Sequence, residues 1–373
     1  MNRRELAAAA GALVFLRALP TGAFAAQSKG ATASAEAHDL YRRAVVVDCN
    51  LAADIDGFPI SATDLDMYRG SGLTAIKTTI GGFNDSFEST IKDMAVYLQA
   101  IETYPDVFMQ IRRVEDIAAA KRERRLGIIL SFEGVGMLEG KLERIELFRR
   151  LGVRVMQLSY NTTSPFAAGV MVNPPSGLTE LGHAAVAKMN ERGVAVDLSH
   201  AGPKTTEDAI AASARPVLVT HGGCAAIHPH PRNKTDQQLR ALADKGGVIG
   251  IFDLPYLTAS PHQPEVKDYI DHMAHALSVC GEDHVGIGSD ATVQPFDTSP
   301  QAMKEFQKSL VERRAAGVAA PEEDRPLYVV GLNVPNRGEV IADALLQRNY
   351  PPRVAEKVLG SNFVRVFGEI WKT

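Results

Sequence analysis

The sequence contains eight short apolar runs of strand length, separated by longer stretches with the apolar spacing of amphipathic helices. The runs are AVVVD, LTAIKTT, LGIILSFE, VRVMQLSY, VAVDLSH, PVLVTH, GGVIGIF and HVGIGSD. The clearest helical patterns between them lie at 87–101, 141–151, 181–192, 206–214 and 266–280. Strands that alternate with helices pair in parallel through right-handed crossovers. The pattern therefore predicts a parallel α/β fold.

The number of runs indicates which parallel fold this is. No linker rich in proline or glycine divides them, and eight strands with their helices are the number that closes a (β/α)8 barrel. A doubly wound sheet is the alternative, but no glycine-rich phosphate turn follows the first run. After about residue 299 the sequence predicts an excursion from the barrel and then two closing helices. The segment Tyr350-Pro351-Pro352 separates these two helices. We expect a single TIM-type barrel domain over residues 39–373.

The first 26 residues differ in character from the rest of the chain. Arg3 and Arg4 precede a short apolar run, and Ala-Phe-Ala at 23–25 has the form of a cleavage site. We interpret residues 1–26 as a signal peptide, and the arginine pair indicates the twin-arginine type. An uncleaved N-terminal anchor is the alternative, although the apolar run is short for a membrane span.

The remaining composition indicates an exported protein without an integral membrane segment. Residues 27–38 are small and polar, which predicts a flexible N-terminus of the mature chain, and no later run is long enough to span a membrane. We therefore expect a periplasmic or secreted protein. A formal net charge of −4 does not favour a nucleic-acid partner. Three cysteines, Cys49, Cys224 and Cys280, are too few for a disulfide scaffold.

Polar side chains close five of the eight runs: Glu133, Tyr160, His200, His221 and Asp290. In a barrel these strand ends converge on one mouth, where barrel enzymes place their chemistry. A single histidine there is more often a structural residue, and a single aspartate commonly caps the next helix. Two histidines and a glutamate together are the ligand set of a hydrolytic zinc site. We therefore predict that Glu133, His200 and His221 bind a metal ion.

The segment HPHPRNKTD, at 228–236, follows the run that ends in His221. In a loop at the mouth, Arg232 could bind a substrate carboxylate through two parallel hydrogen bonds. The alternative is an ordinary ion pair with a surface acid. His228 and His230 alternate with prolines, whose extended geometry spreads neighbouring residues along a loop. We expect a structural role for these two histidines.

Several short motifs follow one another in order along the chain. They are SFEG at 131–134, LSYNTT at 158–163, GLTELG at 177–182, DLSH at 197–200, TH at 220–221, HPRN at 230–233, HVGIGSD at 284–290 and LGSNFVRVF at 359–367. From about residue 40 to the C-terminus, the chain thereby resembles the membrane dipeptidase (renal dipeptidase) family of zinc metallopeptidases. The resemblance implies a barrel with two zinc ions, a bridging glutamate, and a water or hydroxide between the ions as nucleophile.

The resemblance also implies roles for individual residues. Glu133 corresponds to the bridging carboxylate, and His200 and His221 correspond to the two histidines of one zinc ion. Arg232 matches the residue that holds the C-terminal carboxylate of the substrate. Asp290 matches the acid that handles a proton and the substrate amine. A homodimer is a further implication, because family members often form dimers.

The first run departs from the family pattern. Members of the family end this strand in Asp-Gly-His-Asn-Asp, whose histidine and last aspartate bind the second zinc ion, whereas this chain has Asp-Cys-Asn-Leu-Ala at 48–52. Asn50 stands at the histidine position and Ala52 at the aspartate position. Asparagine is a weak oxygen donor and alanine offers no ligand atom. The period of two places residues 48, 50 and 52 on one face, which predicts that Cys49 points toward the helices.

Three further positions bear on the second metal ion and on the substrate. Asp54 and Asp56 would supply ligands if the loop after the first run folds inward. Tyr160 falls where some family members have a histidine near the scissile carbonyl and others have a tyrosine. After Asp290 the chain continues Ala-Thr, where the family usually has Phe-Asp.

The leading hypothesis is an exported metallohydrolase that cleaves dipeptides or related small amides. It expects one zinc ion, or two if the loop supplies ligands, with Asp290, Glu133 and Tyr160 as catalytic residues. Arg232, Tyr160 and Asp290 would bind the substrate. The alternative is a dipeptidase-like protein without peptidase activity that binds or tailors a small peptide. A lyase or isomerase that uses no metal has no positive feature in the sequence.

Overall fold

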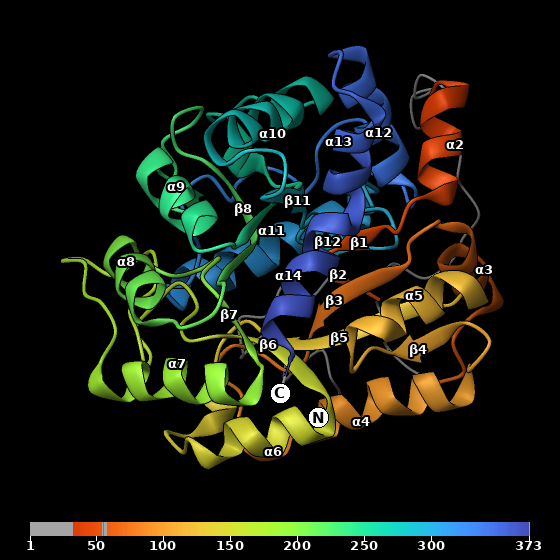
Figure 1. The fold of residues 1–373 in the computed structure, drawn as a ribbon. Coiled ribbons are helices and arrows are strands. Elements are labelled where there is room, and N and C mark those ends of the chain that lie inside the picture. The colour runs from red at the N-terminus through yellow and green to blue at the C-terminus, as the bar shows by residue number, and fades with distance from the viewer. Residues whose placement is uncertain (1–32, 54, 56–57, 373) are drawn as a thin grey trace.

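The computed structural model describes residues 33–53, 55 and 58–372 (Figure 1). The predicted signal peptide at 1–26 lies outside these residues, as do Asp54 and Asp56. The predicted flexible segment, 27–38, overlaps helix α2 (Ala35–Arg43). The helix includes the last residues of that segment because the Ser34 side chain accepts a hydrogen bond from the backbone N–H of Ala37 and caps its first turn.

Eight parallel strands form a closed ring, and their positions coincide with the eight predicted runs. They are β1 (Val47–Asp48), β3 (Ala75–Thr79), β5 (Leu126–Phe132), β6 (Val153–Gln157), β7 (Ala195–Asp197), β8 (Leu218–Cys224), β10 (Val248–Ile251) and β11 (Val285–Ile287). Strand β10 pairs with both β8 and β11, and β11 pairs with β1, which closes the ring. The predicted (β/α)8 barrel is confirmed, and the doubly wound alternative is excluded.

Helices surround the ring on its outside (Figure 1). They are α3 (Ala62–Gly70), α4 (Phe87–Thr103), α5 (Val114–Glu123), α6 (Glu143–Leu151), α7 (Glu180–Arg192), α8 (Pro203–Ala212), α9 (Asp236–Asp244) and α10 (Val266–Cys280). Helix α10 shows why they pack there, because its buried residues include Tyr269, Met273, Ala276 and Cys280 at helical spacing. The ring strands, which these helices cover, are apolar on both faces, and all seven residues of β5 are buried.

Short elements flank the ring and were not predicted, because two or three residues carry no readable period. Strand β2 (Leu51–Ala52) pairs with β12 (Ala291–Thr292), β4 (Phe108–Gln110) pairs with β5, and β9 (Asn233–Lys234) pairs with β8. The short helices η1 (Gly136–Leu138) and η2 (Pro255–Leu257) follow β5 and β10.

The chain ends in α12 (Arg337–Gln347), α13 (Pro352–Glu356), η3 (Lys357–Ser361) and α14 (Asn362–Ile370).

Helix α14 closes one end of the barrel. Its aromatic residues, Phe363 and Phe367, pack with one buried residue from each of seven ring strands: Val47, Ala75, Ile129, Val155, Ala195, Leu218 and Val248. Cys49 belongs to the same inner cluster. The prediction that Cys49 points toward the outer helices is therefore wrong. Val47 and Cys49 share this cluster, as the period of two requires, whereas the shared face predicted for Asp48 and Asn50 is lost because the chain turns after Asp48, where the Asn50 N–H donates to the Asp48 carboxylate.

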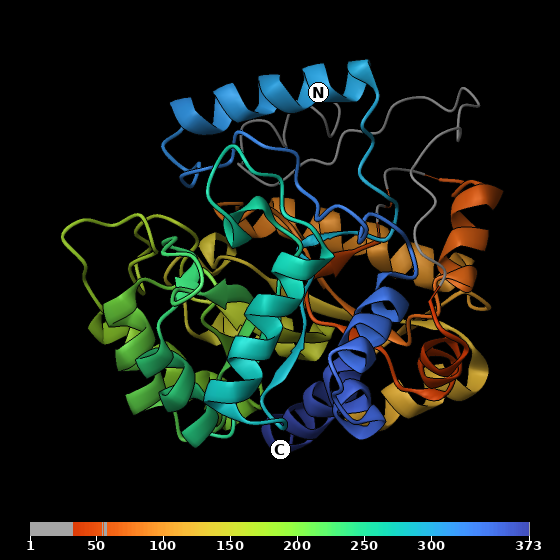
Figure 2. The same ribbon diagram turned by 90° about the horizontal axis from the view of Figure 1, so that it is seen from above.

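The excursion after residue 299 covers the opposite end of the barrel. It consists of helix α11 (Pro300–Ala315) and the segment 316–335, and Figure 2 shows α11 on the far side of the molecule from α14. Glu323 anchors the segment, because it accepts hydrogen bonds from Arg313 at 2.9 and 3.0 Å and from the Tyr256 hydroxyl at 2.8 Å. Within the described residues, no helix combines the length and the apolar character needed to cross a bilayer.

The two histidines of the HPHP segment attach their loop to this cover. His228 Nε2 lies 3.1 Å from a carboxylate oxygen of Glu322, and His230 Nε2 lies 2.8 Å from the carbonyl oxygen of Pro321. The His230 ring also stacks on Tyr256 at 4.2 Å. Both contacts agree with the structural role expected for His228 and His230.

Candidate metal centre

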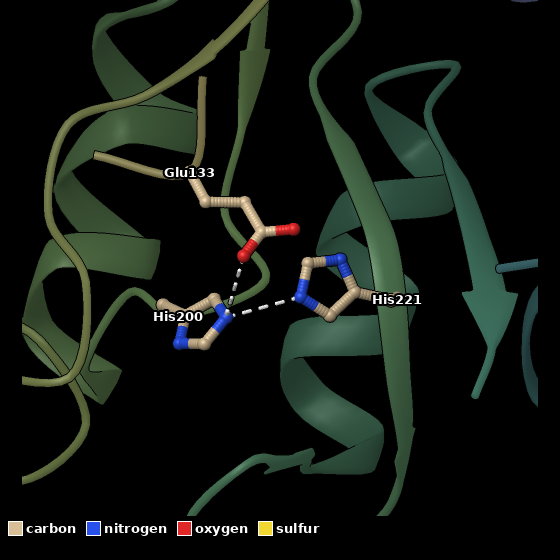
Figure 3. A group of neighbouring side chains, drawn as sticks. All are labelled: Glu133, His200 and His221. Atoms are coloured by element: carbon tan, nitrogen blue, oxygen red, sulfur yellow. Dashed lines mark hydrogen bonds and ion pairs between the residues drawn. The ribbon is translucent and has the colours of Figure 1, made fainter. Parts of the chain in front are cut away.

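The three predicted metal ligands meet at the covered end of the barrel. Glu133 directly follows β5, His200 follows β7, and His221 lies within β8. Each offers one ligand atom, and these atoms lie within 4.8 Å of one another (Figure 3). His200 Nε2 lies 3.1 Å from His221 Nε2 and 4.0 Å from Glu133 Oε2. Both imidazole rings are buried.

Hydrogen bonding fixes which nitrogen of His200 carries the proton. His200 Nδ1 lies 2.7 Å from Asn161 Oδ1, an oxygen that only accepts, while Asn161 Nδ2 donates to the carbonyl oxygen of Val318 at 2.9 Å. The second bond sets the orientation of the amide, so we assign the proton of neutral His200 to Nδ1. His200 Nε2 is then left with a free lone pair.

A similar chain of hydrogen bonds fixes the tautomer of His221. The Asp197 carboxylate accepts hydrogen bonds from the hydroxyls of Ser199 and Thr220, each at 2.6 Å, which uses both hydroxyl protons. Thr220 Oγ1 therefore accepts the 2.9 Å hydrogen bond that it shares with His221 Nδ1. His221 Nε2, like His200 Nε2, is left with a lone pair and no proton.

Two lone pairs thus face each other across 3.1 Å, an arrangement that is repulsive unless a cation lies between them. Burial, followed by the charge of Arg232, holds the pKa of both His200 and His221 well below the usual range, so protonation does not relieve the repulsion. One metal ion bonded at about 2.0–2.1 Å to each nitrogen bridges such a gap. With the Glu133 carboxylate beside them, these side chains fit a divalent ion, and two imidazoles with a carboxylate suit zinc.

The two oxygens of Glu133 have different surroundings. Oε1 accepts hydrogen bonds from Asn50 Nδ2 and from Thr79 Oγ1, both at 2.9 Å. Oε2 faces His200 Nε2. One oxygen is therefore held by the protein, and the other is turned toward the two free imidazole nitrogens.

Asp290 lies next to His221 and shares a hydrogen-bond donor with Glu133. Its Oδ1 accepts a 2.8 Å hydrogen bond from Asn50 Nδ2, and its Oδ2 lies 4.0 Å from His221 Nε2. The residue has a left-handed backbone, with φ of 57°, and its N–H donates to the Asn50 carbonyl at 2.7 Å. Burial and the nearby charge of Glu133 raise the pKa of Asp290 to about 7. The carboxyl group therefore borders the metal ligands without being one of the three.

Tyr160 forms a wall of the site. Its ring stacks on His200, with the centroids 4.1 Å apart, and on Phe83 at 4.7 Å. Burial raises the pKa of the Tyr160 hydroxyl, so the phenol stays protonated and can donate a hydrogen bond.

Arg232 is buried at the same end of the barrel, where it is 2% exposed. Within the part of the chain that the structure describes, its Nε and Nη2 atoms have no hydrogen-bond partner. The surface ion pair considered as an alternative is therefore not what holds these atoms. Buried guanidinium N–H groups without a partner are costly, and a planar carboxylate satisfies two of them at once.

The first strand contributes no second set of ligands among the described residues. Asn50 uses its amide nitrogen to hydrogen-bond Glu133 and Asp290, and its Oδ1 accepts a 2.6 Å hydrogen bond from Lys77 Nζ. Ala52 lies in β2, paired with Thr292. Burial raises the pKa of the Cys49 thiol well above its usual range, which agrees with a core position rather than a ligand.

Three residues that support the predicted ligands were not predicted from the sequence. Asn161, Asp197 and Thr220 orient the two imidazoles, although the motifs LSYNTT, DLSH and TH contain them. Lys77 was missed as well. Its signal was a single charged residue inside the apolar run LTAIKTT.

The closed parallel barrel and the ligands at its strand ends define a metal-dependent, hydrolase-like barrel. The model of the family described as membrane dipeptidase, peptidase family M19, matches residues 39–315. The chain belongs to this family, as its motifs indicated.

Known proteins agree with this assignment. Dipeptidase tcpJ of Claviceps purpurea is 28% identical over 288 residues, which cover 76% of this chain and 60% of that relative. An amidohydrolase from Pseudomonas aeruginosa superposes with a TM-score of 0.79 at 28% identity, covering 90% of this chain and 99% of that one. A metallopeptidase from Rhodobacter sphaeroides has a TM-score of 0.72 at 19% identity, covering 88% and 99%, and shows the same fold.

Proposed function

We propose that this chain is an exported metallohydrolase that cleaves dipeptides or related small amides at a mononuclear zinc site. One observation carries the proposal: two buried imidazole nitrogens with free lone pairs face each other beside a carboxylate oxygen. The unpaired N–H groups of Arg232 support a substrate that ends in a carboxylate. The dipeptidase name of the Claviceps relative supports the same substrate class.

Each side chain then has a defined part in the reaction. Glu133, His200 and His221 would hold the ion, which supplies a Lewis acid for the amide carbonyl and lowers the pKa of a water molecule. Arg232 binds the terminal carboxylate of the substrate through two parallel hydrogen bonds and so orients the scissile amide. The Tyr160 hydroxyl donates a hydrogen bond to the carbonyl oxygen.

Asp290 moves the proton. Its Oδ2 lies beside His221 Nε2, while its Oδ1 is held by Asn50. Asp290 accepts a proton as the oxygen of water bonds to the amide carbon, and it then donates that proton to the leaving nitrogen as the C–N bond breaks. The products are a carboxylic acid and an amine, and the acid then passes its remaining proton to the amine to give a carboxylate and an ammonium group.

A matched pair of histidine variants tests the metal site. His221→Ala should lose both the bound ion and dipeptide hydrolysis, because one of the two facing nitrogens is gone. Metal content of the purified protein and release of free amino acids are the measurements. His228→Ala is the control, since the His228 side chain pairs with Glu322 of the cover and is not one of the predicted metal ligands, so this variant should keep both properties. Survival of metal binding or of activity in His221→Ala would contradict the proposal.

Arg232→Met tests the substrate class. The variant should lower kcat/KM for dipeptides roughly 10- to 150-fold, because a charge-assisted hydrogen bond contributes about 1.5–3 kcal/mol. Dipeptides with an amidated C-terminus should be hydrolysed equally poorly by both proteins. An equal loss for acid and amide substrates would show that Arg232 does not bind the terminal carboxylate.

Asn50 and Ala52 favour a second candidate, a dipeptidase-like protein that binds or tailors a small peptide without peptidase activity. It shares the Arg232 site with the leading proposal but lacks turnover. Isothermal titration with dipeptides, alongside the hydrolysis assay, separates the two. Full turnover of ordinary dipeptides would exclude this candidate, and binding without turnover would establish it.

Export and assembly are proposed from the sequence and the family. Cleavage of the signal peptide at 1–26 would start the mature chain at residue 27, before the barrel domain at 39–373. N-terminal sequencing of protein from the periplasm and the medium tests the cleavage. Light scattering of the mature protein distinguishes the proposed homodimer from a monomer.

A further inference from the structure

The side chain of Lys77 is fully buried in the centre of the barrel, next to the metal centre. Its Nζ donates to Asn50 Oδ1 at 2.6 Å and lies 3.9 Å from an oxygen of Glu133 and 3.9 Å from an oxygen of Asp197. A buried ammonium group is costly unless charges and hydrogen bonds compensate it. Here the compensating groups are Asn50, the predicted ligand Glu133, and Asp197, which orients His221 through Thr220.

Asn50 connects this ammonium group to the two carboxylates of the site. Its Nδ2 donates to Glu133 at 2.9 Å and to Asp290 at 2.8 Å, while its oxygen accepts from Lys77. Both N–H groups of the amide are used, and the charge of Lys77 polarises the amide toward stronger donation. Lys77 and Asn50 together therefore hold two carboxylates, those of Glu133 and Asp290, close to each other although the two would otherwise repel. A cation at this place would have the same effect.

We propose that Lys77, acting through Asn50, takes the place of a second metal ion, so that the centre binds a single divalent ion. The inference rests on the mononuclear site of the proposed function and names the residue that makes it mononuclear. A second divalent ion near Glu133 Oε1 would meet a fixed ammonium charge at close range, and the oxygens it needs are already occupied by hydrogen-bond donors.

Two variants that differ only at residue 77 test the role of the ammonium group. Asn50→His with Ala52→Asp restores the ligand pair that the family resemblance implies. A second protein carries the same two changes and Lys77→Met. After dialysis against zinc, elemental analysis should give one ion per chain for the wild type and for the double variant, and two for the triple variant. Two ions in the double variant, or one in the triple variant, would overturn the inference.

A second measurement disturbs the protein less. Electron paramagnetic resonance with excess Mn²⁺ distinguishes isolated ions from a spin-coupled pair. The wild type should show isolated ions. Lys77→Met frees the Asn50 oxygen and removes the ammonium charge beside Glu133 and Asp197, so it should show the coupled pair, because oxygen ligands suit Mn²⁺. Lys234→Met removes another buried lysine, one that contacts the Ala201 carbonyl instead, and should resemble the wild type.

The outcomes separate this inference from the proposed function. Circular dichroism and retention of the first ion show that a variant is folded, and a folded Lys77→Met without a coupled pair would overturn the inference. A wild-type protein that binds two ions and cleaves dipeptides would also overturn it, while the hydrolase proposal would stand. A wild-type protein that binds no ion would overturn the proposed function and the inference with it.

Discussion

The two halves of the barrel mouth satisfy their polar groups in opposite ways. On the side of β7 and β8, His200 and His221 each pair one ring nitrogen with the protein and leave the other free. On the side of β1 and β3, the amide of Asn50 is fully paired and Lys77 provides the positive charge. The first half fits an ion from outside, as we propose, and the second carries its cation on its own chain. Both halves have buried polar residues, so the difference lies in which lone pairs remain free.

Glu133 joins the two halves, so its loss should have the largest effect. Glu133→Gln removes a negative charge that both Lys77 and the ion require. The amide also places an N–H group where either Lys77 or the ion needs an oxygen. We expect zinc affinity to fall more than about 100-fold, beyond the loss that outer hydrogen-bond partners cause. Competition with a chromophoric chelator measures it.

Thr79→Val is the matched control for Glu133. It removes only the hydroxyl that donates to Oε1 and should weaken zinc binding less than about tenfold. Wild-type affinity in Glu133→Gln would show that the halves are not linked through this carboxylate.

Asn161→Ala tests the free half alone. Without Oδ1, His200 loses the partner that fixes its tautomer and ring orientation, and zinc affinity should fall about 10- to 100-fold. Asn161→Asp keeps an acceptor oxygen and should recover most of the loss, which a merely structural role for Asn161 would not predict. If the alanine variant binds zinc like the wild type, the tautomer assignment is wrong.

His272 contrasts with His200 and His221, because both of its ring nitrogens are hydrogen-bonded within the protein. Nδ1 accepts from the Cys224 N–H and Nε2 donates to the Leu257 carbonyl, each at 2.9 Å, and burial lowers the His272 pKa to about 4. The unfolded chain has the ordinary pKa near 6.5. It therefore binds the extra proton first, and the stability from neutral His272, present above pH 6.5, is lost as the pH falls toward 4.

The expected effect is small but specific. Between pH 6.5 and 5.5 the contribution of His272 to the free energy of unfolding should fall by about 1 kcal/mol. Urea unfolding with a chelator present measures it, and the wild type should lose that much more than His272→Gln. Equal losses in the two proteins would mean that His272 takes up a proton in the folded state as readily as in the unfolded chain.

The sequence predicted the ring strands because they are buried on both faces and read as apolar runs. It predicted Glu133, His200 and His221 as metal ligands because they are polar residues at the ends of apolar runs. It did not predict the surroundings of Lys77, whose partners at 50, 133 and 197 come from three different strand ends. No local period places these residues together. The predicted orientation of Cys49 failed because it assumed that Asp48 and Asn50 share one face, and the turn after Asp48 breaks that relation while Cys49 stays in the cluster of Val47.

The bond from Asn161 to Val318 links the cover of the mouth to His200, a predicted metal ligand. Val318 belongs to the segment that covers the mouth, and its carbonyl orients the amide that holds His200. A movement of the cover that breaks this bond therefore also loosens one metal ligand. The two events share one free energy of coupling: an ion in the centre favours the closed cover, and by reciprocity the closed cover tightens the ion. In the proposed hydrolase, access of substrate and retention of metal would thereby be balanced against each other through the amide of Asn161.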